Sequence, residues 1–169
     1  MKRLAVTKVL AVLLSINGAS VIAASPVNPH YTIAIEGSFD DVYDEFKNAI
    51  ISKGVAIDYV GNVDQMLERT SQAQLSKGES SKQVISVYLF AKYMQFCKSA
   101  ITHKAVQANP QNLSMCPFVV FIYETAANPG QIIIGYRPPT LGTDESSKAV
   151  SQEVVSFLNT ILVEVASNY

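Results

Sequence analysis

The chain has 169 residues with a formal net charge of −1, and 49% of its residues are hydrophobic against 16% charged. This length and composition predict one globular domain with enough apolar side chains for a core. They exclude the strongly basic surface of nucleic-acid-binding domains, and we expect no nucleic acid among the partners.

The N-terminal segment has the three parts of a secretory signal. Lys2, Arg3 and Lys8 form a basic start, a mainly apolar run follows, and small residues up to Ala24 offer a cleavage site. Residues 1–24 are therefore predicted to be a signal peptide and the protein to be periplasmic or secreted. Cleavage removes three basic residues and no acidic one, which leaves 145 residues with a net charge of −4. We expect no later segment to span a membrane, and hence no membrane partner after cleavage.

The remaining sequence is predicted to be an extended leader, residues 25–30, followed by a single domain over residues 31–169. Apolar residues recur at strand and helix spacings in the order β-α-β-α-β-α-β-β-α. In chain order the predicted elements are a strand at 31–35, a helix at 38–54, a strand at 55–60, a helix at 64–76, a strand at 83–91, a helix at 93–108, strands at 117–124 and 131–136, and a helix at about 144–167.

The ends of the predicted helices carry recognisable capping residues. Ser38, with Asp41 three residues later, resembles a capping box in which Asp replaces Glu. Gly54 can supply the left-handed conformation that commonly ends a helix. Thr143 or Asp144 is expected to cap the last helix.

Apolar residues in the second half of the chain predict how the elements pack. Residues 117–124 are almost wholly apolar and are predicted to be a central strand buried on both faces. A turn at Asn128, Pro129 and Gly130 should join this strand to the next as a hairpin. The helix at 144–167 has an apolar stripe that must lie on an apolar surface. The fold class is therefore predicted to be α+β, a mainly antiparallel sheet with helices packed on one face and a long C-terminal helix.

The block that contains the two cysteines resembles a known protein family. Its most specific positions are Phe96-Cys97, His103-Lys104-Ala105, Asn109-Pro110 and Met115-Cys116-Pro117, followed by the apolar run 119–124. With Ser38-Phe39-Asp40-Asp41 and the Gly54 helix exit, these positions make the chain similar to DUF302, a family of domains of unknown function. The resemblance covers roughly residues 31–136.

The resemblance implies an α+β domain similar to the TATA-box-binding-protein-like fold, without implying DNA binding. It also implies dimerisation, so we expect a homodimer. The family has no established activity and therefore supplies no catalytic residues. The C-terminal helix lies beyond the matched part and is predicted to be a local elaboration or a dimer surface.

Cys97 and Cys116 are the only cysteines, and three interpretations remain open for them. Because the chain is predicted to be exported, they can form a structural disulfide that closes a loop of about 20 residues. They can instead be two reduced, buried cysteines that act as small apolar residues. In the third interpretation they are a functional thiol pair, for redox chemistry, sulfur transfer or soft-metal binding.

Four further residues are candidates for ligand binding. Met94 is expected on the same helix face as Cys97, and Met115 adjoins Cys116, so two thioethers could join two thiolates around a soft metal. Core filler is the favoured interpretation of both methionines. His103 is expected at a helix surface, and Arg137, at a strand end, can meet an anion or a surface carboxylate. No metal site and no cofactor are predicted.

The sequence contains no nucleophile elbow, phosphate loop or zinc-protease motif, and no catalytic residue is predicted. We therefore expect a non-catalytic, exported binding or interaction module, homodimeric and able to hold a small ligand between sheet and helix. The alternative is a periplasmic protein that performs thiol redox or sulfur transfer, or binds a soft metal or haem, through Cys97 and Cys116.

Overall fold

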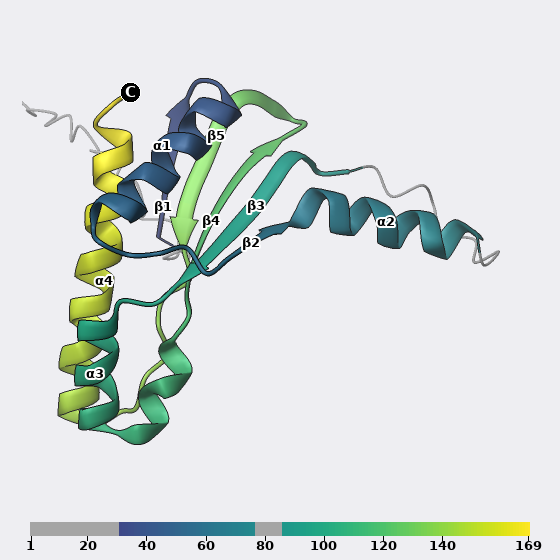
Figure 1. Cartoon of the computed structure of the whole chain (residues 1–169). Helices are drawn as coiled ribbons and strands as arrows, with labels where there is room; N and C mark the ends of the chain where they lie inside the picture. Colours follow the sequence, from purple (N-terminus) through teal and green to yellow (C-terminus); the bar gives the residue numbers. More distant parts are fainter. Residues whose placement is uncertain (1–30, 77–85) are drawn as a thin grey trace, which may run out of the picture.

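A computed structural model describes residues 31–76 and 86–169 (Figure 1). The predicted signal peptide, the leader, the loop at 77–82 and the first residues of the strand predicted at 83–91 lie outside these ranges. The described elements are β1 (Tyr31–Glu36), α1 (Phe39–Ser52), β2 (Tyr59–Asn62), α2 (Val63–Ser76), β3 (Tyr88–Phe96), α3 (Ser99–Ala108), the 3-10 helix η1 (Pro110–Met115), β4 (Phe118–Thr125), β5 (Asn128–Tyr136) and α4 (Glu145–Ala166).

The five strands form one antiparallel sheet in the order β1-β5-β4-β3-β2. Helices α1 and α4 cover one face of this sheet, and α3 lies beside the N-terminal half of α4 (Figure 1). Helix α2 projects away from the rest of the domain on the side opposite α4 (Figure 1). The predicted α+β class, the antiparallel sheet and the long last helix are therefore confirmed.

The core lies between the sheet and the helix layer. Alternate residues of the strands point into it because successive side chains of a strand face opposite sides. The apolar stripe of α1 is buried, and so is the whole apolar stripe of α4. The buried residues of α1 are Phe39, Val42, Phe46, Ala49 and Ile50. The buried residues of α4 are Val150, Val154, Leu158, Ile161, Leu162 and Val165. The stripe of the last helix is thus part of the core and is not a surface left for a partner.

Helix α4 is also long and apolar enough, by length and composition, to cross a membrane. This differs from the expectation that no later segment has these properties. The core helix of a globular domain passes the same test. The buried stripe of α4 accounts for its apolar composition, because one face of the helix must be apolar to pack on the sheet.

Of the three predicted helix ends, two are confirmed and one is wrong. The side chain of Asp144 accepts a hydrogen bond from the Ser147 backbone N–H at 2.9 Å and caps α4, as predicted. The Ser38 side chain makes no capping hydrogen bond, so the predicted capping box is wrong. Gly54 has φ of +69°, the left-handed conformation expected after α1.

The third strand ends five residues later than the sequence predicted, and the helix after it is shorter. Residues 93–96 were expected in a helix but belong to β3, which pairs with β4 as far as Phe96 and Phe118. Met94 is fully buried on this strand, so it does not share a helix face with Cys97. Strand pairing on both sides of β3 outweighs the helix propensity of single residues there.

Two neighbouring boundaries also shift. The strand predicted to end at residue 60 continues through Gly61 and Asn62, which pair with β3 opposite Tyr93 and Lys92. The β4–β5 hairpin is confirmed, with its turn at residues 126–127. The residues predicted for that turn begin β5, where the Gly130 N–H donates to the Glu124 carboxylate at 2.8 Å.

Candidate functional site

Cys97 and Cys116 form a disulfide. Their Cα atoms are 5.6 Å apart, within the usual range for a disulfide. Cys97 follows the end of β3, and Cys116 lies between η1 and the start of β4. Both residues are half-buried. The bond therefore ties the β3–α3 junction to the segment that enters the central strand.

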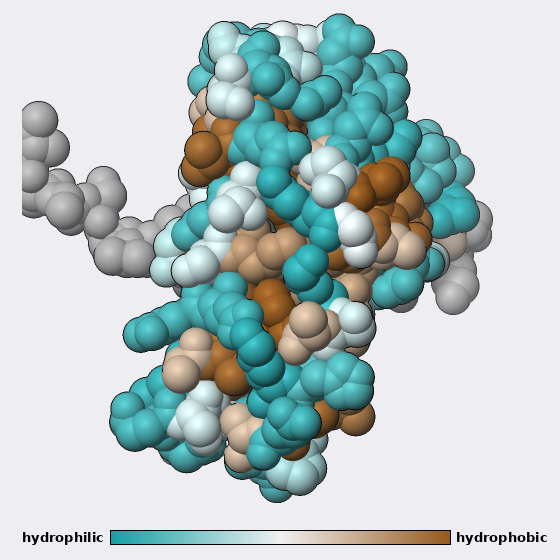
Figure 2. Space-filling model, turned by 60° about the vertical axis from the view of Figure 1, so that its left-hand side comes forward, coloured by the Kyte–Doolittle hydropathy of each residue, from teal (hydrophilic) through white to brown (hydrophobic). Residues whose placement is uncertain are grey.

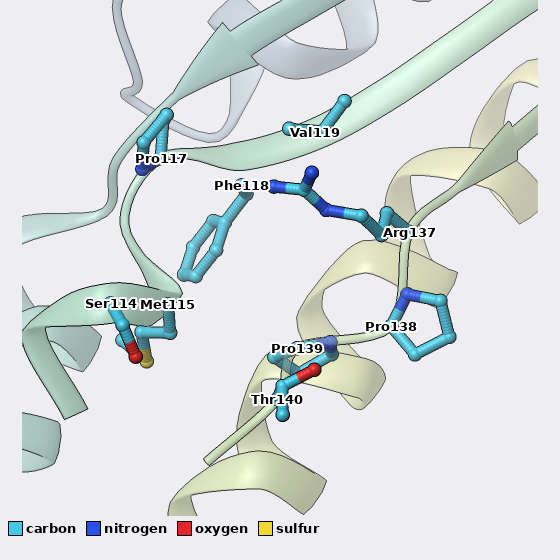
Figure 3. Close-up of a pocket in the computed structure, with 9 residues that line it drawn as sticks. All are labelled: Ser114, Met115, Pro117, Phe118, Val119, Arg137, Pro138, Pro139 and Thr140. Carbon is cyan, nitrogen blue, oxygen red and sulfur yellow. The ribbon is translucent and has the colours of Figure 1, made fainter.

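A pocket of about 310 Å³ opens next to Cys116. One wall comes from the end of η1 and the start of β4, and the other from the segment that leaves β5 (Figure 3). Met115 and Phe118, which are 4% and 3% exposed, form a buried apolar floor. The lining residues are Ser114, Met115, Pro117, Phe118, Val119, Arg137, Pro138, Pro139 and Thr140.

Each wall of the pocket is anchored to the rest of the fold. The disulfide holds the first wall through Cys116, which lies between the lining residues Met115 and Pro117. The second wall leaves β5 with the Arg137 N–H donating to the Val119 carbonyl at 2.9 Å. Further along, the Gly142 N–H donates to the buried Asn112 side chain at 3.0 Å.

Asn112 connects three segments through its side-chain amide. Its amide nitrogen donates to the Ala105 carbonyl at 3.1 Å and to the Ser147 hydroxyl oxygen at 2.7 Å. The Ser147 hydroxyl in turn donates to the Asp144 carboxylate at 2.6 Å. These bonds join α3, η1, the segment after β5 and the start of α4. A buried polar network with all its partners in place rigidifies the structure around it.

Two ionisable side chains that contact α4 have shifted pKa values. Hydrogen bonds from the Ser146 and Ser147 hydroxyls hold the pKa of the Asp144 carboxyl well below its usual range. Burial raises the pKa of Tyr136, the last residue of β5, to about 12. The Tyr136 hydroxyl donates to the Asn159 side chain of α4 at 3.0 Å. Both groups hold α4 in place and do not line the pocket.

The structure brings two of the four predicted ligand-binding residues together. Met115 and Arg137 both line the pocket, Met115 in its floor and Arg137 at its edge. Met94 is in the core, and His103 is exposed on α3, so neither lines the pocket. Among residues 31–76 and 86–169, no group of three or more His, Cys, Asp or Glu side chains is placed to hold a metal ion.

Sequence reasoning missed the other residues of the pocket. Ser114, Phe118 and Thr140 come from two segments more than 20 positions apart, and no spacing links them. The adjacent Pro138 and Pro139 could have indicated a rigid wall, because prolines stiffen a segment that leaves a strand. The bridging role of Asn112 was harder to predict, since asparagine is common in turns and loops without such a role.

A second surface is formed by the sheet face opposite the helices. Rows of aromatic side chains cross it, and two of them lie over glycines that leave room for the rings: Tyr93 over Gly61, and Phe121 over Gly135. The rings of Tyr59 and Tyr93 are 5.9 Å apart, and those of Phe121 and Tyr123 are 6.2 Å apart. The side chains on this face are partly exposed, so β4 is not buried on both faces as predicted.

Comparison with known proteins agrees with this architecture. A crystal structure of an uncharacterised conserved DUF302 protein from Bacillus stearothermophilus is similar in fold, with a TM-score of 0.59 at 14% identity. The match covers 80% of this chain and 97% of that one. A search of curated proteins found no significant match.

The family model for DUF302, a domain of unknown function, matches residues 31–165. The match includes α4 almost to its end, so the expectation that the last helix is a local elaboration is wrong. It also extends the resemblance beyond residues 31–136, the part that the sequence motifs covered. The chain therefore belongs to the DUF302 family.

Proposed function

We propose that this protein is an exported, non-catalytic binding module whose ligand site is the pocket between η1 and the segment after β5. The observation that carries the proposal is the pocket itself, a 310 Å³ space with a buried apolar floor at the end of the sheet. Its volume is at the lower end of the range that small-molecule sites occupy. Export is supported by the N-terminal sequence and by the disulfide, which is typical of oxidising compartments.

The anchored walls also favour a binding role. One wall is held by the disulfide and the other by the hydrogen bond from Gly142 to Asn112. A site whose walls are held before the ligand arrives loses less conformational entropy on binding. The affinity for a small ligand is correspondingly higher than for a pocket between mobile loops.

Binding of a neutral apolar probe tests the proposal. Benzyl alcohol added to the ¹⁵N-labelled mature chain should shift the amide signals of Ser114, Phe118 and Thr140 along one saturable curve. A Ser114→Trp variant, which fills the pocket, should lose this response. Leu113→Trp is the matched control, because Leu113 is 61% exposed and does not line the pocket. Shifts that survive in Ser114→Trp would place the binding elsewhere and contradict the proposal.

We further propose that the chain forms a homodimer through the sheet face opposite the helices. Within the described ranges, no helix other than the projecting α2 lies on that side of the sheet (Figure 1). α2 exposes Met66 and Leu67 at more than 40% each, and the sheet face carries Tyr59 and other partly exposed aromatic residues. Two apolar surfaces of one chain can cover each other across a twofold axis. By contrast, hydrophilic side chains cover much of the side that carries α4 (Figure 2).

Sedimentation velocity distinguishes the two sides of the molecule. Ile133 lies between the buried Ile132 and Ile134 on β5, so its side chain faces away from the core. Ile133→Lys should convert a wild-type dimer to a monomer with an unchanged circular dichroism spectrum. Val163→Lys, at a 60% exposed position of α4, should leave the dimer intact. A monomeric wild type, or dissociation only in Val163→Lys, would refute this interface.

Thiol chemistry is the second candidate function, and one observation favours it. Both cysteines are half-buried, so a small thiol can approach the disulfide beside the pocket. In this proposal the protein performs redox chemistry or sulfur transfer, or binds a soft metal or haem once the cysteines are reduced. It requires a disulfide that opens and closes within the range of cellular thiol buffers.

A further inference from the structure

We infer that the ligand of the pocket is a small carboxylic acid with an apolar body, whose carboxylate is bound by Arg137. This inference rests on the proposed binding function and names the chemical class of its ligand. Among the described residues that line the pocket, Arg137 is the only charged one. Its side chain extends from the end of β5 towards the β4 wall (Figure 3).

The guanidinium of Arg137 has no counter-ion in the described part of the chain. It makes no ion pair or side-chain hydrogen bond with any residue of 31–76 or 86–169. Four lysines of the same domain are each paired with a carboxylate: Lys47, Lys53, Lys104 and Lys148. The pocket therefore presents one positive charge that no lining residue of 31–76 or 86–169 neutralises.

Two hydroxyl groups also line the pocket. The side chains of Ser114 and Thr140 come from opposite walls, and both residues are exposed (Figure 3). Neither hydroxyl is hydrogen-bonded to another described residue. A planar guanidinium binds a carboxylate through two parallel hydrogen bonds, and the two hydroxyls leave the pocket able to hydrogen-bond a further polar atom of the ligand.

The remaining lining offers carbon surface to an apolar part of the ligand. Met115 and Phe118 form the buried floor, and Pro117, Pro138 and Pro139 form much of the walls. Proline has no backbone N–H, so these walls offer carbon surface rather than hydrogen-bond donors. A bare inorganic anion would leave this surface uncovered, whereas an aliphatic or aromatic acid covers the floor and meets Arg137 at the rim.

Three probes and two variants test the inference on the mature chain. Benzoate, benzyl alcohol and inorganic phosphate are titrated separately while the amide signals of the pocket are followed. We expect benzoate to bind at least about tenfold more tightly than benzyl alcohol, because only the carboxylate accepts charge-assisted hydrogen bonds from Arg137. Phosphate should bind more weakly than benzoate because it gains nothing from the apolar floor.

Arg137→Gln should reduce benzoate affinity about tenfold or more and leave benzyl alcohol binding unchanged. Arg69→Gln is the matched control, since Arg69 is exposed on α2 and also lacks a described ion-pair partner. Equal binding of benzoate and benzyl alcohol, unaffected by Arg137→Gln, would overturn the ligand class and leave the binding function standing. Phosphate binding as tight as that of benzoate would also overturn it. If neither aromatic probe shifts the pocket signals, the proposed function fails together with the inference.

Discussion

Replacing Leu158 with aspartate is expected to abolish the cooperative thermal unfolding of the domain. Leu158 is fully buried in the middle of α4, where it packs in the core between helix layer and sheet. Truncation of a buried leucine alone costs about 2–5 kcal/mol, and whole domains are stable by only about 5–15 kcal/mol. A carboxylate at this position must also be removed from water without a partner. Circular dichroism during heating measures the loss directly.

Val163→Asp is the matched control for this change. It introduces the same side chain into the same helix, at a position that is 60% exposed. Its melting curve should nearly overlay that of the wild type, because surface substitutions usually change stability by less than about 0.5 kcal/mol. If Leu158→Asp keeps the wild-type melting curve, α4 does not contribute the core that the structure assigns to it.

Loss of the disulfide is expected to lower the stability of the folded state by about 3 kcal/mol. The bond joins residues 19 positions apart and restricts the unfolded chain accordingly. In a domain of this size the melting midpoint of the Cys97→Ala/Cys116→Ala double variant should fall by roughly 10 °C. Differential scanning calorimetry of the oxidised wild type and the variant provides the comparison.

Reduction offers an internal check on that result. A phosphine reductant should lower the midpoint of the wild type and have no effect on the double variant. Equilibration in glutathione buffers then distinguishes a structural disulfide from a functional thiol pair. Only a functional pair is oxidised and reduced within the range of redox potentials that these buffers cover. A wild type whose midpoint is unchanged by full reduction would show that the disulfide is not a structural staple.

The pattern of apolar residues identified most elements correctly. The stripe of α1 recurs at three and four residues, and all five of its members are buried. The stripe of α4 behaves in the same way, and its Asp144 cap was among the expected residues. These predictions succeed because helical periodicity records which face of a helix is removed from water. The residues around the two cysteines likewise indicated the correct family, whose model matches residues 31–165.

The boundaries that failed are those where one strand depends on its neighbours. Residues 93–96 include good helix formers, yet they pair with β2 on one side and β4 on the other. Glycine has little intrinsic preference for a strand, yet Gly61 lies in β2 opposite Tyr93. A larger residue does not fit there, because its side chain would overlap the Tyr93 ring. Such contacts arise between segments distant in sequence, so a local pattern carries no record of them.

The sequence by itself thus determined the class of fold, the core faces of the long helices, the cysteine pair as a possible staple and the membership of the family. Only the tertiary structure decided that Cys97 and Cys116 are bonded and that the apolar stripe of the C-terminal helix packs on the sheet of its own chain. It also decided that Arg137 shares a pocket with Met115, Phe118 and Thr140. The physical reason is that periodicity indicates which face of a single element is buried. A pocket is formed by side chains from distant segments, which meet only when the whole sheet has formed.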